Sequence, residues 1–149
     1  MLSGTLIHSQ ILEALGRAGH GSKILIADGN YPASTTRGAN AKFVPLNLSP
    51  GLVSCTQILE ALVTTVPVES AAVMQYYREG PYALLENPPI WGEFRKILDG
   101  SGQPSTLEEI ERWAFYETAS QPDVCLTIVS GDQRVYANLL LTIGVILPE

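Results

Sequence analysis

Short apolar runs alternate along the chain with longer stretches in which apolar residues recur every three or four positions. The clearest runs cover residues 24–27, 71–74 and 124–129, and none of them alternates strictly between apolar and polar residues. Apolar runs of this length, of which only 124–129 contains a polar residue (Thr127), predict buried strands, and they suit a parallel sheet that is covered on both faces.

Three stretches predict helices, because their apolar residues fall on one face at helical spacing. They cover residues 9–18, from about 54 to 66, and 90–100. Gly19 stands directly after the first stretch, where a helix commonly ends on glycine. A fourth helix is predicted to begin at Ser105 and to run to about residue 119, since Ser105 and Glu108 have the spacing of a capping box.

Two less regular strands complete the pattern. Residues 42–46 predict a short strand that Pro45 restricts to the edge or the end of a sheet, and residues 139–147 predict a strand broken at Gly144. Residues 75–89 contain three tyrosines and three prolines without any period, which predicts an irregular excursion. Alternating helices and apolar strands indicate one domain with a three-layer α/β/α fold and a central, largely parallel sheet, in which the order of the strands is not readable.

Composition narrows the classes of function. Only 16% of the residues are charged and 46% are hydrophobic, so part of the surface is expected to be buried in an oligomer. The net charge of −6 argues against a nucleic-acid partner, because binding a phosphate backbone needs a basic patch. No apolar run approaches the ~20 residues that span a bilayer, and the N-terminus lacks the pattern of a secretory signal. We therefore expect a cytoplasmic protein that does not bind membranes.

Several common sites are missing from the sequence. It has no glycine-rich phosphate loop, no dinucleotide-binding fingerprint and no serine-hydrolase elbow. The two histidines, His8 and His20, and the distant Cys55 and Cys125 do not have the spacing of metal ligands, so we expect no metal site within one chain. Both cysteines are interpreted as small buried hydrophobic residues.

The best lead to chemistry surrounds the first predicted strand. His20 lies between two glycines before this strand, and Asp28 follows it, where open α/β sheets place their ligands. Each also has a structural explanation, since Asp28 opens an ordinary Asp-Gly-Asn turn and a histidine after a helix can bond the last carbonyls. An extended strand would separate His20 and Asp28 by up to ~25 Å at ~3.3 Å per residue. They can then act on one ligand only if the glycine-framed loop folds back or a neighbouring subunit supplies one of them.

Four more polar residues complete a candidate site, namely Arg112, Tyr116, Tyr136 and Asn138. An imidazole both gives and takes protons near neutral pH, and Asp, Asn, Arg and Tyr satisfy the hydroxyls of a neutral polyol in fixed directions. Taken singly, each of the four could instead be a turn residue, a surface charge or a core ring.

Three motifs, in order along the chain, resemble the ribose pyranase and L-fucose mutarotase family. The first is Gly-His-Gly at 19–21, followed by Ile-Leu-Ile-Ala-Asp at 24–28 and by Tyr31-Pro32. The last is Tyr-Ala-Asn-Leu-Leu-Leu at 136–141, followed by Gly-Val-Ile at 144–146. The middle one, Arg-Trp-Ala-Phe-Tyr-Glu at 112–117, is similar to the Arg-Phe-Ala-Phe-Tyr-Glu of the fucose branch, whereas the ribose branch has a histidine in that region.

The resemblance implies a mutarotase that interconverts the α and β anomers of L-fucose or a related monosaccharide, without a cofactor or a metal. It implies that His20 is the catalytic acid and base. It also implies contacts with the sugar from a further set of residues, with Tyr116 ranked last: Asp28, Arg112, Tyr136, Ala137, Asn138 and Tyr116. Members of this family form ring-like homo-oligomers, commonly decamers of two pentameric rings, so the resemblance implies a homo-oligomer here.

The sequence departs from the family pattern at a few positions. Tyr31 and Trp113 each stand where a Phe is expected, and Ala137 matches the Tyr-Ala-Asn of the ribose branch rather than the Tyr-Gly-Asn of the fucose branch. Two alternatives therefore stay open. One is a ribose-type pyranase, which interconverts pyranose and furanose forms, and the other is a non-catalytic sugar-binding protein on the same scaffold.

Overall fold

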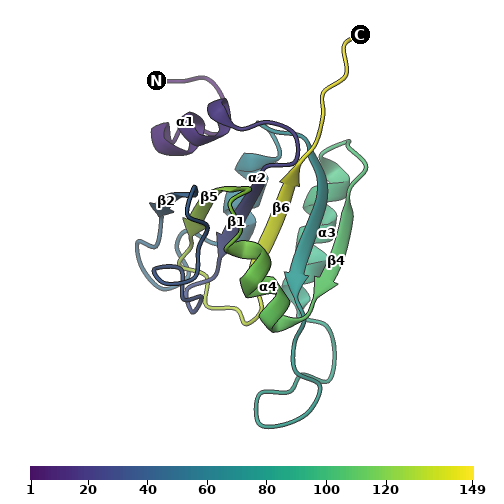
Figure 1. The fold of residues 1–149 in the computed structure, drawn as a ribbon. Coiled ribbons are helices and arrows are strands. Elements are labelled where there is room, and N and C mark those ends of the chain that lie inside the picture. The colour runs from purple at the N-terminus through teal and green to yellow at the C-terminus, as the bar shows by residue number, and fades with distance from the viewer.

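A six-stranded sheet forms the centre of the computed structural model, which describes residues 1–149 (Figure 1). Four helices accompany it, namely α1 (Ser9–Arg17), α2 (Cys55–Leu62), α3 (Pro89–Gly100) and α4 (Arg112–Ala119). The strands are β1 (Lys23–Ala27), β2 (Lys42–Pro45), β3 (Val68–Met74), β4 (Thr106–Ile110), β5 (Val124–Val129) and β6 (Leu139–Ile143).

The strands are arranged in the order β2-β5-β1-β6-β3-β4. Strand β6 is antiparallel to both of its neighbours, and the remaining pairs are parallel, which confirms a largely parallel sheet. Because β6 runs in the opposite direction, its amino end lies at the same edge of the sheet as the carboxyl ends of the other strands. The strand β2, which contains Pro45, is an edge strand, as predicted.

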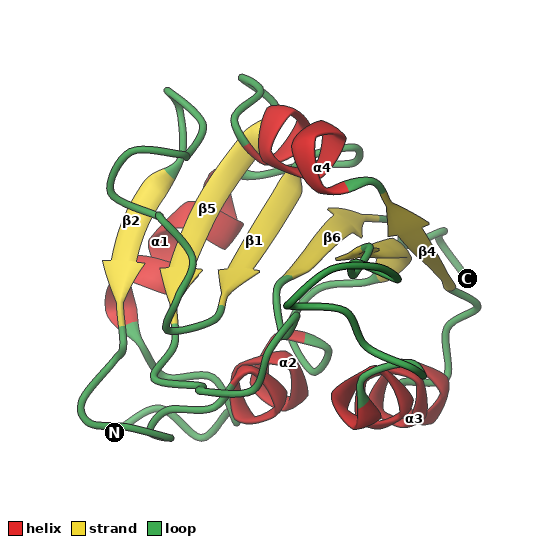
Figure 2. Cartoon of the chain, turned by 90° about the horizontal axis from the view of Figure 1, so that it is seen from below, coloured by secondary structure: helices red, strands yellow, loops and turns green.

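Helices cover both faces of the sheet, which gives the predicted three layers (Figure 2). Helices α1, α2 and α3 pack on one face over a core of 24 buried residues, and α4 packs on the other face over a core of 10. Along β1, Ile24 and Ile26 enter the larger core, while Leu25 and Ala27 enter the smaller one. An unbroken apolar run is therefore needed in β1, since neither face of the strand meets solvent.

The predicted helix start at Ser105 is wrong. Residues 106–110 form the edge strand β4, which pairs in parallel with β3, and helix α4 begins only at Arg112. The carboxylate of Glu111 caps this helix by accepting the backbone N–H groups of Trp113 and Ala114 at 3.0 and 3.1 Å. The edge strand β4 is polar and largely exposed, so its sequence contains no apolar run that would identify a strand. The capping-box spacing of Ser105 and Glu108 then favours a helix start instead.

The end of the last strand and the burial of the second cysteine differ from the sequence prediction. The last strand ends at Ile143, and residues 145–147 after Gly144 are exposed instead of continuing it. Both cysteines are free; Cys55 is fully buried, while Cys125 is only partly buried. Burial raises the pKa of the Cys55 thiol to about 12, so the thiol stays protonated. No helix has both the length and the hydropathy that crossing a bilayer requires.

Gly131, two residues after the end of β5, packs tightly against the backbone of the turn at residues 49–52. Its N–H donates to the carbonyl oxygen of Val53 at 2.9 Å, and its own carbonyl accepts the N–H of Gly51 at 2.6 Å. A Cβ at this position would overlap the carbonyl oxygen of Leu52 and lie 2.5 Å from that of Ser49. Since these are backbone atoms, the space cannot be made by rotating a side chain.

We therefore expect Gly131→Ala to lower the free energy of unfolding by about 3 kcal/mol, the size of a severe overpacking defect. The matched control is Gly92→Ala in α3, where an added Cβ meets no atom within 4 Å. This substitution should raise the free energy of unfolding by up to about 1 kcal/mol, because alanine favours the helix more than glycine does. Urea unfolding followed by circular dichroism measures both changes. A Gly131→Ala variant as stable as the wild type would show that this contact is looser than described.

Candidate functional site

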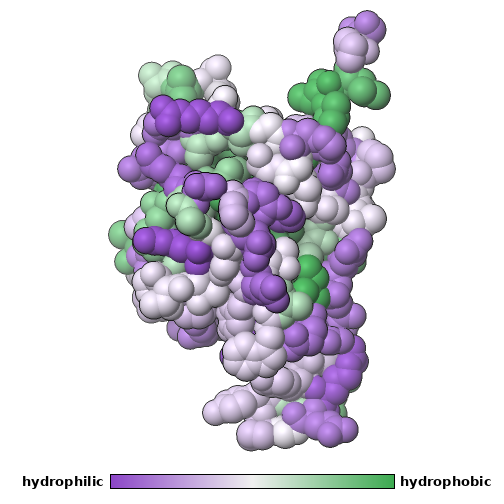
Figure 3. Space-filling model, viewed as in Figure 1, coloured by the Kyte–Doolittle hydropathy of each residue, from purple (hydrophilic) through white to green (hydrophobic).

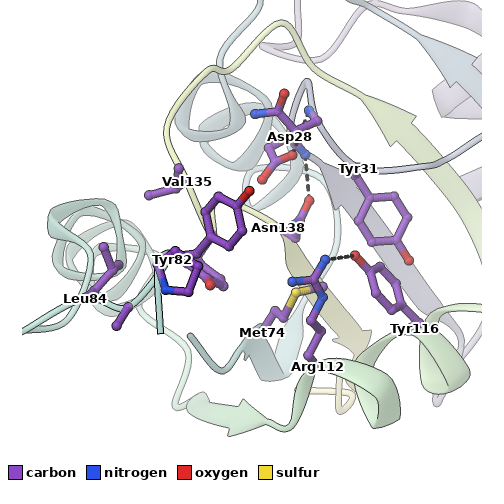
Figure 4. Close-up of a pocket in the computed structure, with 13 residues that line it drawn as sticks. Asp28, Tyr31, Met74, Tyr82, Leu84, Arg112, Tyr116, Val135 and Asn138 are labelled. Atoms are coloured by element: carbon purple, nitrogen blue, oxygen red, sulfur yellow. Dashed lines mark hydrogen bonds between the residues drawn. The ribbon is translucent and has the colours of Figure 1, made fainter. Parts of the chain in front are cut away.

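A cavity of about 570 Å³ lies at the edge of the sheet where β1, β3 and β4 end and β6 begins (Figure 4). Five of the predicted site residues line it: Asp28, Arg112, Tyr116, Tyr136 and Asn138. Side chains from separate elements point into it, so the cavity is assembled by the sheet topology rather than by any single segment. The structure therefore brings together most of the polar set that was singled out in the sequence.

Asp28 follows β1 and is only 3% exposed. Its backbone N–H donates to the Asn138 side-chain oxygen at 2.8 Å, and its carboxylate accepts the N–H of Asn30 at 2.9 Å. Burial raises the pKa of Asp28 to about 6, and the negative charge of Asp132 adds to this effect against the backbone N–H groups that lower the pKa. The cavity therefore contains a carboxyl group that can exchange a proton near neutral pH.

Asp132 is the second buried carboxylate at this edge, and its surroundings have the opposite effect. It forms two hydrogen bonds with the Arg134 guanidinium, at 2.9 and 2.7 Å, and accepts the Cys55 N–H at 3.0 Å. Burial alone would raise the pKa of Asp132, but the bonds from Arg134 and from backbone N–H groups hold that pKa below its usual value. Its carbonyl also accepts the N–H of Gly29 at 2.8 Å, which fixes the turn that carries Asp28.

Arg112 enters the cavity from the first position of α4. Its guanidinium carbon lies 5.3 Å from the ring centroid of Tyr77 and 5.7 Å from those of Trp113 and Tyr116. One terminal nitrogen donates to the Tyr116 hydroxyl at 3.5 Å, and Nε is buried without a partner. Arg112 takes part in no ion pair, so its remaining donors are available to a ligand.

Tyr136 has a backbone conformation that side chains rarely adopt, with φ at 57°. Two contacts hold it there. Its carbonyl oxygen accepts the indole N–H of Trp91 at 3.0 Å, and its hydroxyl accepts the backbone N–H of Tyr77 at 3.3 Å. Unfavourable backbone conformations persist where the surroundings fix them, and they cluster at functional sites. Ala137, by contrast, is fully buried and does not line the cavity.

His20 lies far from this cavity within the chain. It precedes β1, whereas Asp28 follows it, so the two residues flank opposite ends of one strand. The glycine-framed loop does not fold back toward Asp28. Instead, Nε2 of His20 lies 3.0 Å from a carboxylate oxygen of Glu69, at the amino end of β3.

Several cavity residues were not identified from the sequence. The excursion at residues 75–88, which projects from the sheet at the bottom of Figure 1, supplies Tyr82 and Leu84, and Tyr82 faces Tyr31 and Tyr116 across the cavity in Figure 4. Met74 at the end of β3 also lines the wall. The cluster of tyrosines and prolines was a compositional signal, but nothing in its pattern indicated which side chains turn inward. No cluster of three or more His, Cys, Asp or Glu side chains forms a metal-ligand arrangement.

The raised pKa of Asp28 predicts a pH-dependent stability. The folded state binds the Asp28 proton more tightly than the unfolded chain, so this stabilisation is present near pH 4 and is lost as the pH rises through about 6. Relative to Asp28→Asn, the free energy of unfolding of the wild type should fall by on the order of 2 kcal/mol between about pH 4.5 and 7.5. Urea unfolding at both pH values tests this, with the exposed Asp99→Asn as control. A difference that does not change with pH would contradict the shifted pKa.

Known proteins resemble the chain over nearly its full length. It is 31% identical to the fucose mutarotase of Homo sapiens, with 95% of this chain and 90% of the relative covered, and 25% identical to a D-ribose pyranase of Cronobacter sakazakii, with 97% and 99% covered. Among solved structures, FucU from Bifidobacterium longum is 30% identical, with 95% and 96% covered and a TM-score of 0.78. The fucose mutarotase of Streptococcus pneumoniae in complex with L-fucose is 25% identical, with 95% of each chain covered and a TM-score of 0.77.

A family model matches residues 1–146, almost the entire chain, and it is the model of the RbsD / FucU transport protein family. This match agrees with the three ordered motifs of the sequence and with the fold shared with FucU. The chain therefore belongs to the RbsD / FucU family.

Proposed function

We propose that this protein is a mutarotase that interconverts the α and β anomers of L-fucose or a closely related monosaccharide. The observation that carries the proposal is the convergence of Asp28, Arg112 and Asn138 on one cavity with aromatic walls. Carboxylate, guanidinium and amide groups offer both donors and acceptors in fixed directions, as the hydroxyls of a sugar ring require. Fucose mutarotases among the relatives, one of them bound to L-fucose, support the same substrate class.

The apolar part of the cavity favours a deoxy sugar. Met74, Leu84 and Val135 line it together with the Tyr82 ring. L-Fucose carries a methyl group where galactose carries a hydroxymethyl group, and an apolar wall gains from burying a methyl group. D-Ribose has no methyl group that could use this surface.

Anomer exchange needs only the movement of protons. One proton is added to the ring oxygen while another leaves the anomeric hydroxyl, and the ring opens to the aldehyde. The aldehyde rotates, and the ring closes on its other face with the protons returned, so no electrons are transferred and no cofactor is consumed. We assign this proton exchange to His20, because imidazole is suited to both directions near neutral pH. Asp28 and Arg112 hold the hydroxyls, with Tyr136, Asn138 and Tyr116 as further contacts.

Since His20 and the cavity lie at opposite ends of β1, we further propose that a neighbouring subunit of a homo-oligomer supplies His20. Exposed apolar side chains support an assembly. Trp113 and Tyr82, beside the cavity, are 66% and 76% exposed, and the exposed apolar residues 145–147 project at the opposite edge of the sheet, after the end of β6 (Figure 3). Exposed apolar groups of this kind mark interaction surfaces when they gather beside a site. A decamer of two pentameric rings is the assembly that we expect.

A ribose-type pyranase is the second candidate. Ala137 matches the ribose branch of the family, and a D-ribose pyranase is among the relatives. Against it, Arg112 occupies the region where the ribose branch has a histidine. A non-catalytic sugar-binding protein would use the same cavity, but it would not need His20.

In NMR saturation-transfer experiments, we expect the wild type to exchange the two anomers of L-fucose. This exchange should be faster than the exchange between the forms of D-ribose in the presence of the same protein. His20→Ala should slow the exchange by at least about 100-fold, the usual contribution of a general acid and base.

Arg112→Met should raise KM by about tenfold through the loss of charged hydrogen bonds, while Arg17→Met, on the exposed face of α1, should have no effect. Faster exchange of ribose forms would indicate the pyranase. Sugar binding without exchange would indicate the binding protein.

A mixing experiment tests the shared site. His20→Ala and Asp28→Asn subunits should each form inactive oligomers, but mixed oligomers should recover about a quarter of the wild-type activity, because each position of a shared site is filled correctly by chance half the time. Light scattering shows whether the mixed assemblies have the wild-type mass. Mixed oligomers that stay inactive would place the whole site within one subunit.

A further inference from the structure

We infer that Glu69 is a positioning residue that holds the imidazole of His20 with its proton on Nε2, so that Nδ1 is the nitrogen that exchanges protons with the sugar. This inference rests on the proposed function, and it adds a residue that none of the three sequence motifs contains. It also specifies which ring nitrogen takes part in the reaction.

The contact itself joins two distant segments of the chain. Nε2 of His20 lies 3.0 Å from Oε2 of Glu69, and the two residues are 49 positions apart. An ionised carboxylate can only accept hydrogen bonds, so Nε2 must be the donor in this pair. In a neutral imidazole one nitrogen carries the proton and the other accepts, and a partner at one nitrogen therefore decides the role of the other.

An irregularity in β3 exposes Glu69. Ala71 and Val73 face the larger core, and regular alternation would place Glu69, two positions earlier, in that core as well. Val68 occupies the core instead, and the pairing of β3 with β6 shifts its register between Val68 and Ser70. The shift leaves Glu69 exposed, and β-bulges re-aim side chains in this way beside active sites.

Both partners are fixed to the same end of β6. The turn that carries His20 is bonded there by Gly21, whose N–H donates to Ile143 at 2.9 Å, and by Ser22, whose carbonyl accepts the Ile143 N–H at 2.9 Å. Gly21 has a φ of +82°, which favours glycine. On the other side, a Cβ at Gly144 would come within 3.2 Å of the Glu69 Cβ, so a glycine gives Glu69 its room.

The pair contributes little to the stability of the fold. The side chains of His20 and Glu69 are 58% and 44% exposed, and ion pairs in such positions are screened by water. A substitution of Glu69 should therefore leave the protein folded, while it removes the group that orients the imidazole. A hydrogen bond from one ring nitrogen to a carboxylate commonly sets the tautomer of a functional histidine.

The test compares Glu69→Ala, Glu69→Gln and the control Glu60→Ala, an exposed glutamate of α2, with the wild type and with His20→Ala. The ¹⁵N chemical shifts of the imidazole report the tautomer, with His8 as an internal reference. We expect an Nε2-protonated His20 in the wild type and a mixture of tautomers in Glu69→Ala. In L-fucose exchange, Glu69→Ala should lower kcat about tenfold with KM nearly unchanged, and Glu69→Gln, whose amide oxygen still accepts from Nε2, should recover part of this loss.

The outcomes separate the inference from the proposed function. Full activity in Glu69→Ala, together with the loss of activity in His20→Ala, would overturn the role of Glu69 and leave the mutarotase intact. An Nδ1-protonated His20 in the wild type would overturn the inference whatever the activity. Absence of anomer exchange in the wild type would overturn the proposed function and the role of Glu69 with it. Urea unfolding midpoints equal to that of the wild type would confirm that the Glu69 variants are folded.

Discussion

The antiparallel insertion of β6 between β1 and β3 is the constraint on which the candidate site depends. In a fully parallel sheet, the segment that precedes a strand lies at the edge opposite to the segments that follow its neighbours. Because β6 is reversed, Tyr136 and Asn138, which precede it, meet Asp28, which follows β1, at one edge. This arrangement allows the Asp28 N–H to donate a hydrogen bond to the Asn138 side chain, although the two residues are 110 positions apart in the sequence. The same reversal places the end of β6 beside His20 and Glu69 at the other edge.

The two buried carboxylates at this edge, Asp28 and Asp132, differ in their pKa because they have different surroundings. Asp132 has a cation and several N–H donors within reach, so it stays ionised and holds the turn and the helix around it. Asp28 has N–H donors but no cation, so burial dominates and its pKa rises to about 6. A group with this pKa costs stability at neutral pH, and the surrounding fold must compensate for it. Such a cost, in a residue that lines a cavity, is typical of a functional side chain.

Much of the fold could be predicted from the sequence, because both faces of the central strands are buried. The apolar run at residues 24–27 of β1 and the run of β5, in which only Thr127 is polar, suit strands that are covered on both faces. The pattern predicts a helix where the edge strand β4 lies, since an exposed edge lacks such a run, and Ser105, just before the strand, and Glu108 have the spacing of a capping box. The strand order and the reversal of β6 were not readable, because pairing between distant segments leaves no local pattern. The sequence identified most of the polar residues that line the cavity. For the same reason that the strand order was not readable, it did not identify Tyr82, Trp91 or Glu69.

The distribution of chemistry between the two edges argues for function in an assembly. The cavity holds hydrogen-bonding groups and a titratable acid but no imidazole, while His20 lies at the opposite edge of the sheet, beside Glu69. Under the proposed mechanism, in which His20 exchanges the protons, each half is incomplete for anomer exchange when it is taken alone. A ring of identical subunits can bring the His20 edge of one sheet to the cavity edge of the next, since head-to-tail contacts form a ring when the rotation between subunits closes. Such a contact would cover the exposed side chains of Trp113 and Tyr82. On this argument, oligomerisation would complete the active site as well as stabilise the fold.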